Sequence, residues 1–143
     1  MADVLIATDS VRLFRELNSV IGGGDITVRG VPAGVQVLPA VKEAAPDLVI
    51  LDLQIGNMGG MAVCLDLRLE EGMQRIPRLP VIMLLDRRAD VFLARRADAQ
   101  GWLVKPLDPL RVRRAVRTVI DGGTFYDESF RPTPASTIVP AGK

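Results

Sequence analysis

Two carboxylates and a lysine follow short apolar runs in the sequence. Asp9, Asp52 and Lys105 each stand directly after, or one residue after, such a run. If the runs are parallel strands, their carboxyl ends meet at one edge of a sheet, where ligands bind in this class of fold. Neighbouring carboxylates repel one another and attract a hard cation, for which Mg²⁺ with oxygen ligands is suited. A lysine beside them would neutralise a tetrahedral anion. This set has the groups that are needed to receive a phosphoryl group on a carboxylate.

Two absences narrow the chemistry. The sequence holds no histidine, which excludes Ser-His-Asp triads, Cys-His pairs and histidine metal sites. It also lacks a GxGxxG or GxxxxGK[ST] phosphate loop. The glycine run at 22–24 follows a helical pattern rather than a strand, so it is interpreted as a helix end.

Five apolar runs are expected to be strands. They are Val4–Ala7, Ile26–Val31, Leu48–Leu51, Val81–Leu85 and Trp102–Val104. Four of them are nearly continuous, which is typical of strands covered on both faces, whereas Arg29 interrupts the second and indicates an edge strand.

Helical spacing fills the intervals between these runs. Ser10 and Asp108 stand at expected helix N-caps, and Pro109 suits a first helical position. The strand-helix alternation predicts an α/β fold with a doubly wound parallel sheet. Two apolar helix faces are predicted, one of Val11, Phe14, Leu17 and Ile21, and one of Val112, Ala115, Val116, Val119 and Ile120.

Composition indicates an ordinary globular chain. Its 143 residues are 48% apolar and 24% charged, enough for one domain, and 18 basic against 17 acidic residues leave a net charge of +1. This balance argues against binding nucleic acid. With neither a membrane span nor a signal peptide in the pattern, a cytoplasmic location and no membrane association are expected. The single cysteine, Cys64, cannot form an internal disulfide and is expected to pack in a helix.

Four sequence blocks resemble the receiver domain of two-component response regulators. The segment PDLVILDL resembles the phosphoacceptor strand, and VLIATDS, LPVIML and GWLVKPLD match the other receiver blocks in order. The resemblance covers about residues 1–121. It implies a flavodoxin-like receiver fold of five strands in the order 2-1-3-4-5. Residues 122–143, which include three prolines, are expected to be an extended or disordered tail, too short for a DNA-binding output domain.

The resemblance implies roles for individual residues. Asp52 would accept a phosphoryl group from the phosphohistidine of a sensor histidine kinase or phosphotransfer protein, and Lys105 would pair with the phosphoryl oxygens. Pro106 would follow a cis peptide bond. A Mg²⁺ ion would be held by Asp9, Asp52 and the backbone carbonyl of Gln54. The protein would signal to a downstream protein as a single domain and would not be an enzyme, beyond slow Mg²⁺-dependent self-phosphorylation and dephosphorylation.

Several positions depart from the receiver pattern. Thr8 replaces the first of two adjacent acids, and Leu85 replaces the Thr or Ser whose movement lets an aromatic residue, here Trp102, turn inward. Losing that hydroxyl removes a charged hydrogen bond of about 1.5–3 kcal/mol, which weakens phosphorylation-linked switching roughly ten- to a hundredfold. Asp86 is expected to cap the next helix, or alternatively to lie near the site and repel a phosphoryl donor. Glycines in residues 54–60 are expected to loosen the metal loop.

Arginines gather around the expected fourth and fifth helices, the surface through which receivers dimerise or bind targets. Acidic residues nearby, Asp90, Asp98 and Asp121, could answer them in a symmetric homodimer. An acidic protein partner would also suit this surface. The arginines are Arg87, Arg88, Arg95 and Arg96 on the fourth helix and Arg111, Arg113, Arg114 and Arg117 on the fifth.

Three functions stay open on the sequence. The first is a phosphoryl-receiving signalling protein with a degenerate switch. The second is a pseudo-receiver, an interaction module that works without phosphate. The third is a flavodoxin-like protein that binds a nucleotide or another anion at the same edge, against which the acids and the missing phosphate loop count.

Overall fold

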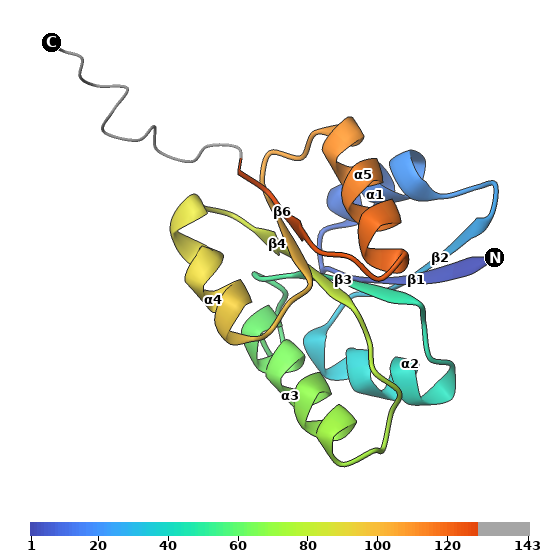
Figure 1. The fold of residues 1–143 in the computed structure, drawn as a ribbon, viewed down its shortest axis with the longest axis vertical. Coiled ribbons are helices and arrows are strands. Elements are labelled where there is room, and N and C mark those ends of the chain that lie inside the picture. The colour runs from blue at the N-terminus through green and yellow to red at the C-terminus, as the bar shows by residue number, and fades with distance from the viewer. Residues whose placement is uncertain (129–143) are drawn as a thin grey trace, which may run out of the picture.

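A computed structural model describes residues 1–128 and shows a parallel sheet covered by helices on both faces (Figure 1). The strands lie in the order β2-β1-β3-β4-β5-β6. The α/β prediction and the order of the first five strands are confirmed, and a sixth strand follows them. The strands are β1 (Ala2–Ala7), β2 (Ile26–Val31), β3 (Leu48–Asp52), β4 (Val81–Leu85), β5 (Gly101–Val104) and β6 (Phe125–Tyr126).

The helices form two layers. α1 (Val11–Ile21) and α5 (Pro109–Ile120) pack together on one face of the sheet, over a core that includes Ile6, Ile50 and Leu84. The other face carries α2 (Val37–Glu43), α3 (Gly60–Gly72) and α4 (Val91–Arg96), with short 3₁₀ turns before α2 (Gly34–Gln36) and α4 (Arg88–Asp90). Figure 1 shows this division, with α1 and α5 together and α2 to α4 on the opposite side.

The central strands and the edge strand of the sheet differ in burial. Every residue of β3 and β4 is buried, as expected for strands covered on both faces. β2 lies at one edge of the sheet, which confirms the expectation from Arg29. Arg29 is held there by an ion pair with Asp3 at 2.9 Å.

Helix ends follow the predicted chemistry in part. The Ser10 hydroxyl accepts a hydrogen bond from the Leu13 amide at 3.1 Å, and Gly22 terminates α1. Asp108 occupies the N-cap position of α5, but its side chain makes no capping hydrogen bond and instead lies 3.8 Å from Arg111. The predicted apolar face of α1 is wrong at Val11, which is 64% exposed. Val11 is the first residue of the helix, and the buried residues of α1 are Leu13, Leu17 and Ile21.

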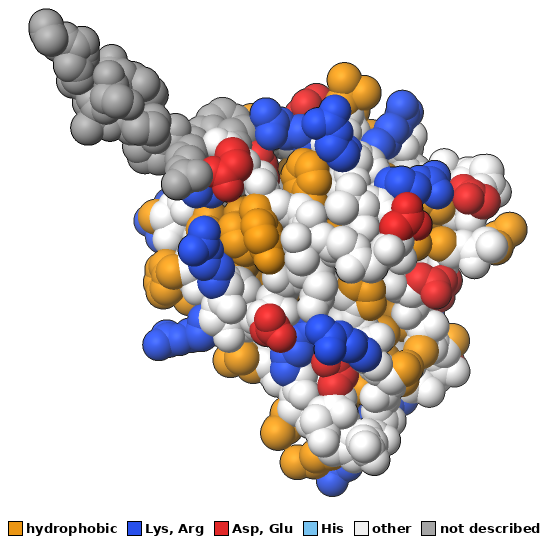
Figure 2. All heavy atoms as spheres, in the orientation of Figure 1, with side chains coloured by type: hydrophobic (Ala, Val, Ile, Leu, Met, Phe, Trp, Pro, Cys, Tyr) orange, Lys and Arg blue, Asp and Glu red, His pale blue; other side chains and the backbone are white. Residues whose placement is uncertain are grey.

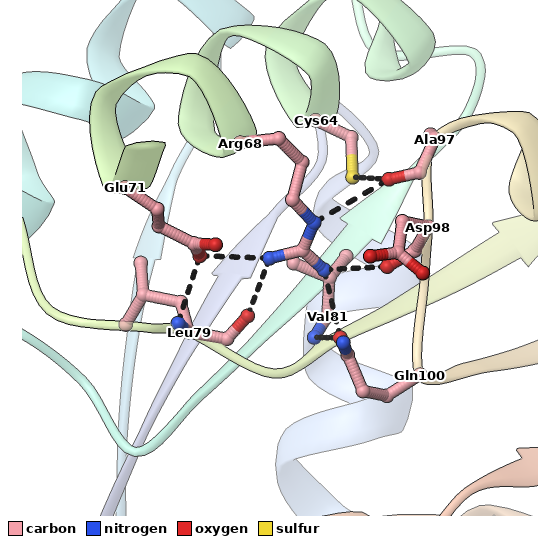
Figure 3. Close-up of polar contacts among 8 residues, drawn as sticks. All are labelled: Cys64, Arg68, Glu71, Leu79, Val81, Ala97, Asp98 and Gln100. Carbon is pink, nitrogen blue, oxygen red and sulfur yellow. Dashed lines mark hydrogen bonds and ion pairs between the residues drawn. The ribbon is translucent and has the colours of Figure 1, made fainter. Parts of the chain in front are cut away.

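Arg68 joins α3 to the loops that enter β4 and β5 (Figure 3). Its guanidinium donates to the Leu79 carbonyl at 2.7 Å, to Gln100 Oε1 at 2.7 Å and to the Asp98 carbonyl at 2.8 Å, and pairs with Glu71 at 2.7 Å. Gln100 and Glu71 in turn accept hydrogen bonds from backbone amides of the same loops. One side chain therefore satisfies polar groups from three segments that meet below the sheet.

The sixth strand lies within the stretch that was expected to be a tail. Phe125 pairs with Gly101 and Tyr126 with Trp102, in parallel with β5. Residues 129–143 of the predicted tail lie outside the described residues. Within residues 1–128, no helix is long and apolar enough to span a membrane.

Candidate functional site

The predicted acceptor carboxylate lies at the carboxyl edge of the sheet. Asp52 is the last residue of β3 and is 3% exposed. Lys105 directly follows β5, and its Nζ lies 2.9 Å from Asp52 Oδ1. The Lys105–Pro106 peptide bond is cis. The parallel sheet brings together the side chains of Asp52 and Lys105, which are 53 residues apart in the chain.

Both carboxylate oxygens of Asp52 are engaged. Oδ2 accepts a hydrogen bond from the Thr8 hydroxyl at 2.8 Å, and Oδ1 accepts from the Gln54 amide at 3.2 Å as well as from Lys105. Thr8 is 5% exposed, and its oxygen also accepts from the Ser10 amide at 3.1 Å. Thr8 therefore binds the Asp52 carboxylate directly, where a second acid would repel it.

Lys105 is shared between two acids. Its Nζ lies 2.8 Å from Asp86 Oδ1 in addition to its contact with Asp52. Partial burial lowers the pKa of Lys105, but the hydrogen bonds that its ammonium group donates to Asp86 and Asp52 outweigh it, and the net shift is upward. The expected capping role of Asp86 is wrong, because no side chain caps the 3₁₀ turn that follows. Asp86 takes the other position foreseen for it, beside the site, because the lysine offers it an opposite charge.

Asp9 is drawn to the loop that follows β3. Its Oδ2 accepts a hydrogen bond from the Gly56 amide at 3.0 Å. The same loop is fixed on its far side, since the Gly56 and Asn57 carbonyls accept from the amides of Gly34 and Val35 at 3.0 Å each. A Cβ at Gly34 would lie 1.9 Å from the Met58 carbonyl oxygen, so only glycine permits this approach. Hydrogen bonds therefore hold this loop on both sides, and its expected loosening stays a prediction.

The residues around Asp52 offer oxygen ligands, which Mg²⁺ prefers, but few negative charges. Asp9, Asp52 and the Gln54 carbonyl are the available oxygens, and no group of three acidic, histidine or cysteine side chains in residues 1–128 could hold a metal. Binding a cation would also compete with Lys105 and Thr8 for the Asp52 oxygens. The residues therefore fit a weak Mg²⁺ site.

The two switch positions are both buried. Leu85 ends β4 and is fully buried, and Trp102 in β5 is 2% exposed. The Trp102 ring stacks on Tyr126 with centroids 4.3 Å apart, and the Arg95 guanidinium lies 5.3 Å from its centroid. The aromatic side chain is thus already turned in and covered.

The eight arginines do not form one surface. Arg87 and Arg88 lie before α4 rather than on it, because the fourth helix begins only at Val91. Arg113 donates to the Val20 carbonyl at 3.2 Å and Arg117 lies 3.6 Å from Asp25, both toward α1 and β2. Figure 2 shows basic side chains interspersed with acidic ones rather than a single basic field. The remaining members of the set, Arg95, Arg96, Arg111 and Arg114, lie on α4 and α5.

One of the acidic residues predicted to pair with arginines of a second copy pairs with an arginine of its own chain instead. Asp90 is 4% exposed and pairs with Arg87 at 2.9 Å, so it is not available to a second copy. Asp127 was missed by sequence reasoning, although it is 2% exposed and pairs with Arg111 at 3.1 Å. No local pattern marks it, because it lies beyond the last helix and its partners come from three other elements.

Comparison with known proteins gives consistent matches. Residues 4–117 match the response regulator receiver domain family. The DNA-binding response regulator MtrA of Mycobacterium tuberculosis is 33% identical over 116 residues, which are 80% of this chain and 48% of that protein. The nitrate/nitrite response regulator protein NarL of Escherichia coli is 27% identical over 96% of this chain and 63% of its own length. The chain spans about half the length of MtrA and its orthologues.

Solved structures share the fold. The signal receiver domain of NarL from Mycobacterium tuberculosis superposes with a TM-score of 0.71 at 26% identity, covering 85% of this chain and 97% of that chain. A chemotaxis response regulator of Vibrio cholerae superposes with a TM-score of 0.73 at 23% identity, covering 83% and 98%. The second likeness bears on the fold alone.

Proposed function

The chain belongs to the response regulator receiver family, and we propose that it accepts a phosphoryl group on Asp52 and passes the signal on by protein contact. The observation that carries this proposal is the ion pair of 2.9 Å between Lys105 and Asp52 at the carboxyl edge of the sheet. A receiver signals by changing its protein contacts, so no substrate turnover beyond slow self-phosphorylation and dephosphorylation is included.

The donor would be the phosphohistidine of a sensor histidine kinase or phosphotransfer protein. An Asp52 oxygen forms the new bond to phosphorus while the phosphorus–nitrogen bond breaks, and the imidazole nitrogen leaves with the electron pair. Lys105 neutralises the phosphoryl oxygens. Mg²⁺, held by Asp9, Asp52 and the Gln54 carbonyl, would offset the negative charge that gathers on the transferred group. We place this exchange in the cytoplasm, which the unpaired buried Cys64 thiol supports.

Phosphorylation of Asp52 would be weakly coupled to the conformation of the protein. Leu85 cannot donate to a phosphoryl oxygen, and Trp102 is already buried beneath Tyr126. A missing hydrogen bond to a charged group removes about 1.5–3 kcal/mol of the difference between the two states. Most of the structural response that such a hydroxyl would drive is therefore absent.

A pseudo-receiver that works without phosphate is the second candidate. Asp86 Oδ1 lies 2.8 Å from Lys105, and the Thr8 hydroxyl lies 2.8 Å from Asp52 Oδ2. These two internal groups already satisfy the lysine and the carboxylate that a phosphoryl group would use. The site would then stabilise one conformation whose surface binds a protein partner.

One experiment separates the two candidates. The protein is incubated with Mg²⁺ and acetyl phosphate, and its intact mass is followed with time. We expect a gain of one phosphoryl group that Asp52→Asn abolishes and Asp121→Asn, an exposed change of the same kind at the end of α5, leaves unaffected. If the folded wild-type chain gains no mass, the phosphoacceptor proposal is wrong and the pseudo-receiver stands.

A further inference from the structure

We propose that the β5 edge is a recognition groove for an extended aromatic–acidic segment, and that this chain fills the groove with its own residues Phe125–Asp127. A protein partner would then reach the face between α4 and α5 only by displacing this segment. The proposal goes beyond phosphoryl transfer and does not depend on it. Figure 1 shows β6 between α4 and α5.

Backbone pairing provides the general part of this recognition. β6 adds to β5 as a parallel strand, with the Phe125 amide donating to the Gln100 carbonyl at 3.1 Å and the Asp127 amide donating to the Trp102 carbonyl at 3.2 Å. Strand addition to an open sheet edge is a common mode of peptide recognition, in which main-chain bonds give affinity and side-chain pockets give specificity. Gly101 suits this edge, because a Cβ there would lie 2.8 Å from the Phe125 carbonyl oxygen.

Alternating side chains provide the specific part. Phe125 packs against the core under α1 and α5, whereas Tyr126 stacks on Trp102 at 4.3 Å with 19° between the rings. Tyr126 remains 46% exposed, so its ring covers the buried tryptophan from outside. The two residues of the strand thus contact opposite sides of the sheet edge.

Asp127 is the charged anchor of the segment. Its Oδ2 accepts from the Val104 amide at 2.9 Å, and its Oδ1 lies 3.1 Å from Arg111 of α5. Its backbone carbonyl accepts from Arg88 at 3.0 Å. The carboxylate is 2% exposed, so it occupies a built site for an acidic side chain rather than a place on the surface. The groove therefore selects an aromatic residue followed by an acid.

The segment occupies the groove because it is covalently attached to the domain. A segment attached to the domain acts at a local concentration near the millimolar range, so a free segment of the same sequence competes poorly. The segment is thus an internal ligand whose contacts can be removed one at a time by substitution. Weakening these contacts should open the groove while leaving the central sheet intact.

The test uses the full chain and a labelled peptide of residues 122–128. Binding is followed by fluorescence anisotropy to the wild type and to the double variant Tyr126→Ala, Asp127→Asn. We expect the double variant to bind the peptide at least tenfold more tightly than the wild type, because its own segment has lost the stack and the charge-assisted hydrogen bonds. Adding Arg111→Ala to the double variant should remove that gain, and Asp121→Asn alone should bind like the wild type.

Hydrogen exchange gives a second test that needs no added peptide. The Val104 amide donates to Asp127, so its hydrogen should exchange at about the same rate as those of the β6 amides. This rate should be faster than that of the Leu84 amide in the central sheet. Gly101→Ala should speed this exchange further, whereas Gly72→Ala, which meets no atom within 4 Å, should not.

Two results would overturn the proposal. One is equal peptide binding, or none, by the wild type and a double variant that keeps the native circular dichroism spectrum. The other is a Val104 amide that exchanges only when the whole domain unfolds.

Discussion

Lys105 holds the central position in the candidate site because two carboxylates share its ammonium group. Asp52 and Asp86 lie 2.9 and 2.8 Å from its Nζ. Asp52 is nearly fully buried, whereas the side chain of Asp86 is 42% exposed. Asp86 is therefore the partner that can leave, and its departure would free the lysine for an incoming anion.

Removing Asp86 should make phosphoryl transfer faster. We expect Asp86→Ala to raise the initial rate of phosphoryl incorporation from acetyl phosphate several-fold, because a negative charge near the donor and a competitor for Lys105 are both lost. Intact-mass time courses would measure this rate, with Asp121→Ala as a matched removal of an exposed acid. An unchanged or lower rate in Asp86→Ala would show that Asp86 does not oppose the donor.

Cys64 should contribute a measurable pH dependence. Burial raises the pKa of its thiol from 9.0 to about 11. Between these values the unfolded chain loses the proton and the folded chain keeps it, so the free energy of unfolding falls as the pH rises, by up to ~2–3 kcal/mol. Urea unfolding at pH 8 to 11 should show this fall in the wild type and a smaller one in Cys64→Ala. Parallel curves for the two proteins would contradict the prediction.

Among the elements, α3 packs on the sheet through the buried Val63, Cys64 and Leu67, and Arg68 adds polar contacts to two neighbouring loops. Arg68 reaches from the helix to the loops before β4 and β5, and its side chain is 15% exposed (Figure 3). The planar guanidinium can donate in several directions at once, which a lysine ammonium on a flexible stem cannot reproduce. The register between β4 and β5 is thereby tied to the position of α3.

Replacing Arg68 should destabilise the whole domain. We expect Arg68→Ala to lower the free energy of unfolding by about 3–5 kcal/mol, because Glu71 and three carbonyls lose their partner. Arg68→Lys should recover only part of this loss. Denaturant melts would measure both, with Arg78→Ala as the control, since Arg78 is exposed. A change within 0.5 kcal/mol, of about the size expected for a surface site, would refute a structural role for this network.

For the molecule as a whole, the proposed phosphoacceptor site and the proposed partner surface lie at separate places on one sheet. The acceptor edge is formed by the loops after β1, β3, β4 and β5, whereas the β5 flank is covered by β6. Val104 belongs to both regions, because its amide binds Asp127 and its neighbour is Lys105. A small set of contacts therefore separates the acceptor site from the self-occupied surface.

Mg²⁺ should stabilise the folded protein modestly. At a concentration ten times its Kd, an ion that binds only the folded state adds about 1.4 kcal/mol to the free energy of unfolding. We expect a rise in the melting temperature with Mg²⁺ that Asp9→Asn removes, while NaCl of equal ionic strength has no comparable effect. A rise that persists in Asp9→Asn would locate the cation elsewhere.

The sequence was sufficient for the first five strands and for predicting that Asp52 and Lys105 lie at one edge of the sheet, but not for the sixth strand. Continuous apolar runs mark buried strands, so the bounds of β2 and β4 could be predicted from local pattern, whereas the order of β1 to β5 was predicted from the resemblance to receiver domains. The placement of Asp52 and Lys105 follows from the same rule, because parallel strands bring their carboxyl ends to one edge.

Only the tertiary structure decided how these side chains are used. Asp86 pairs with Lys105 rather than capping a turn, and Asp127 enters a buried site built by Val104, Arg88 and Arg111. These contacts join residues that lie far apart in the chain. Which charges pair depends on the distance between them and on their burial in the folded protein, and a local pattern of residue types contains neither quantity.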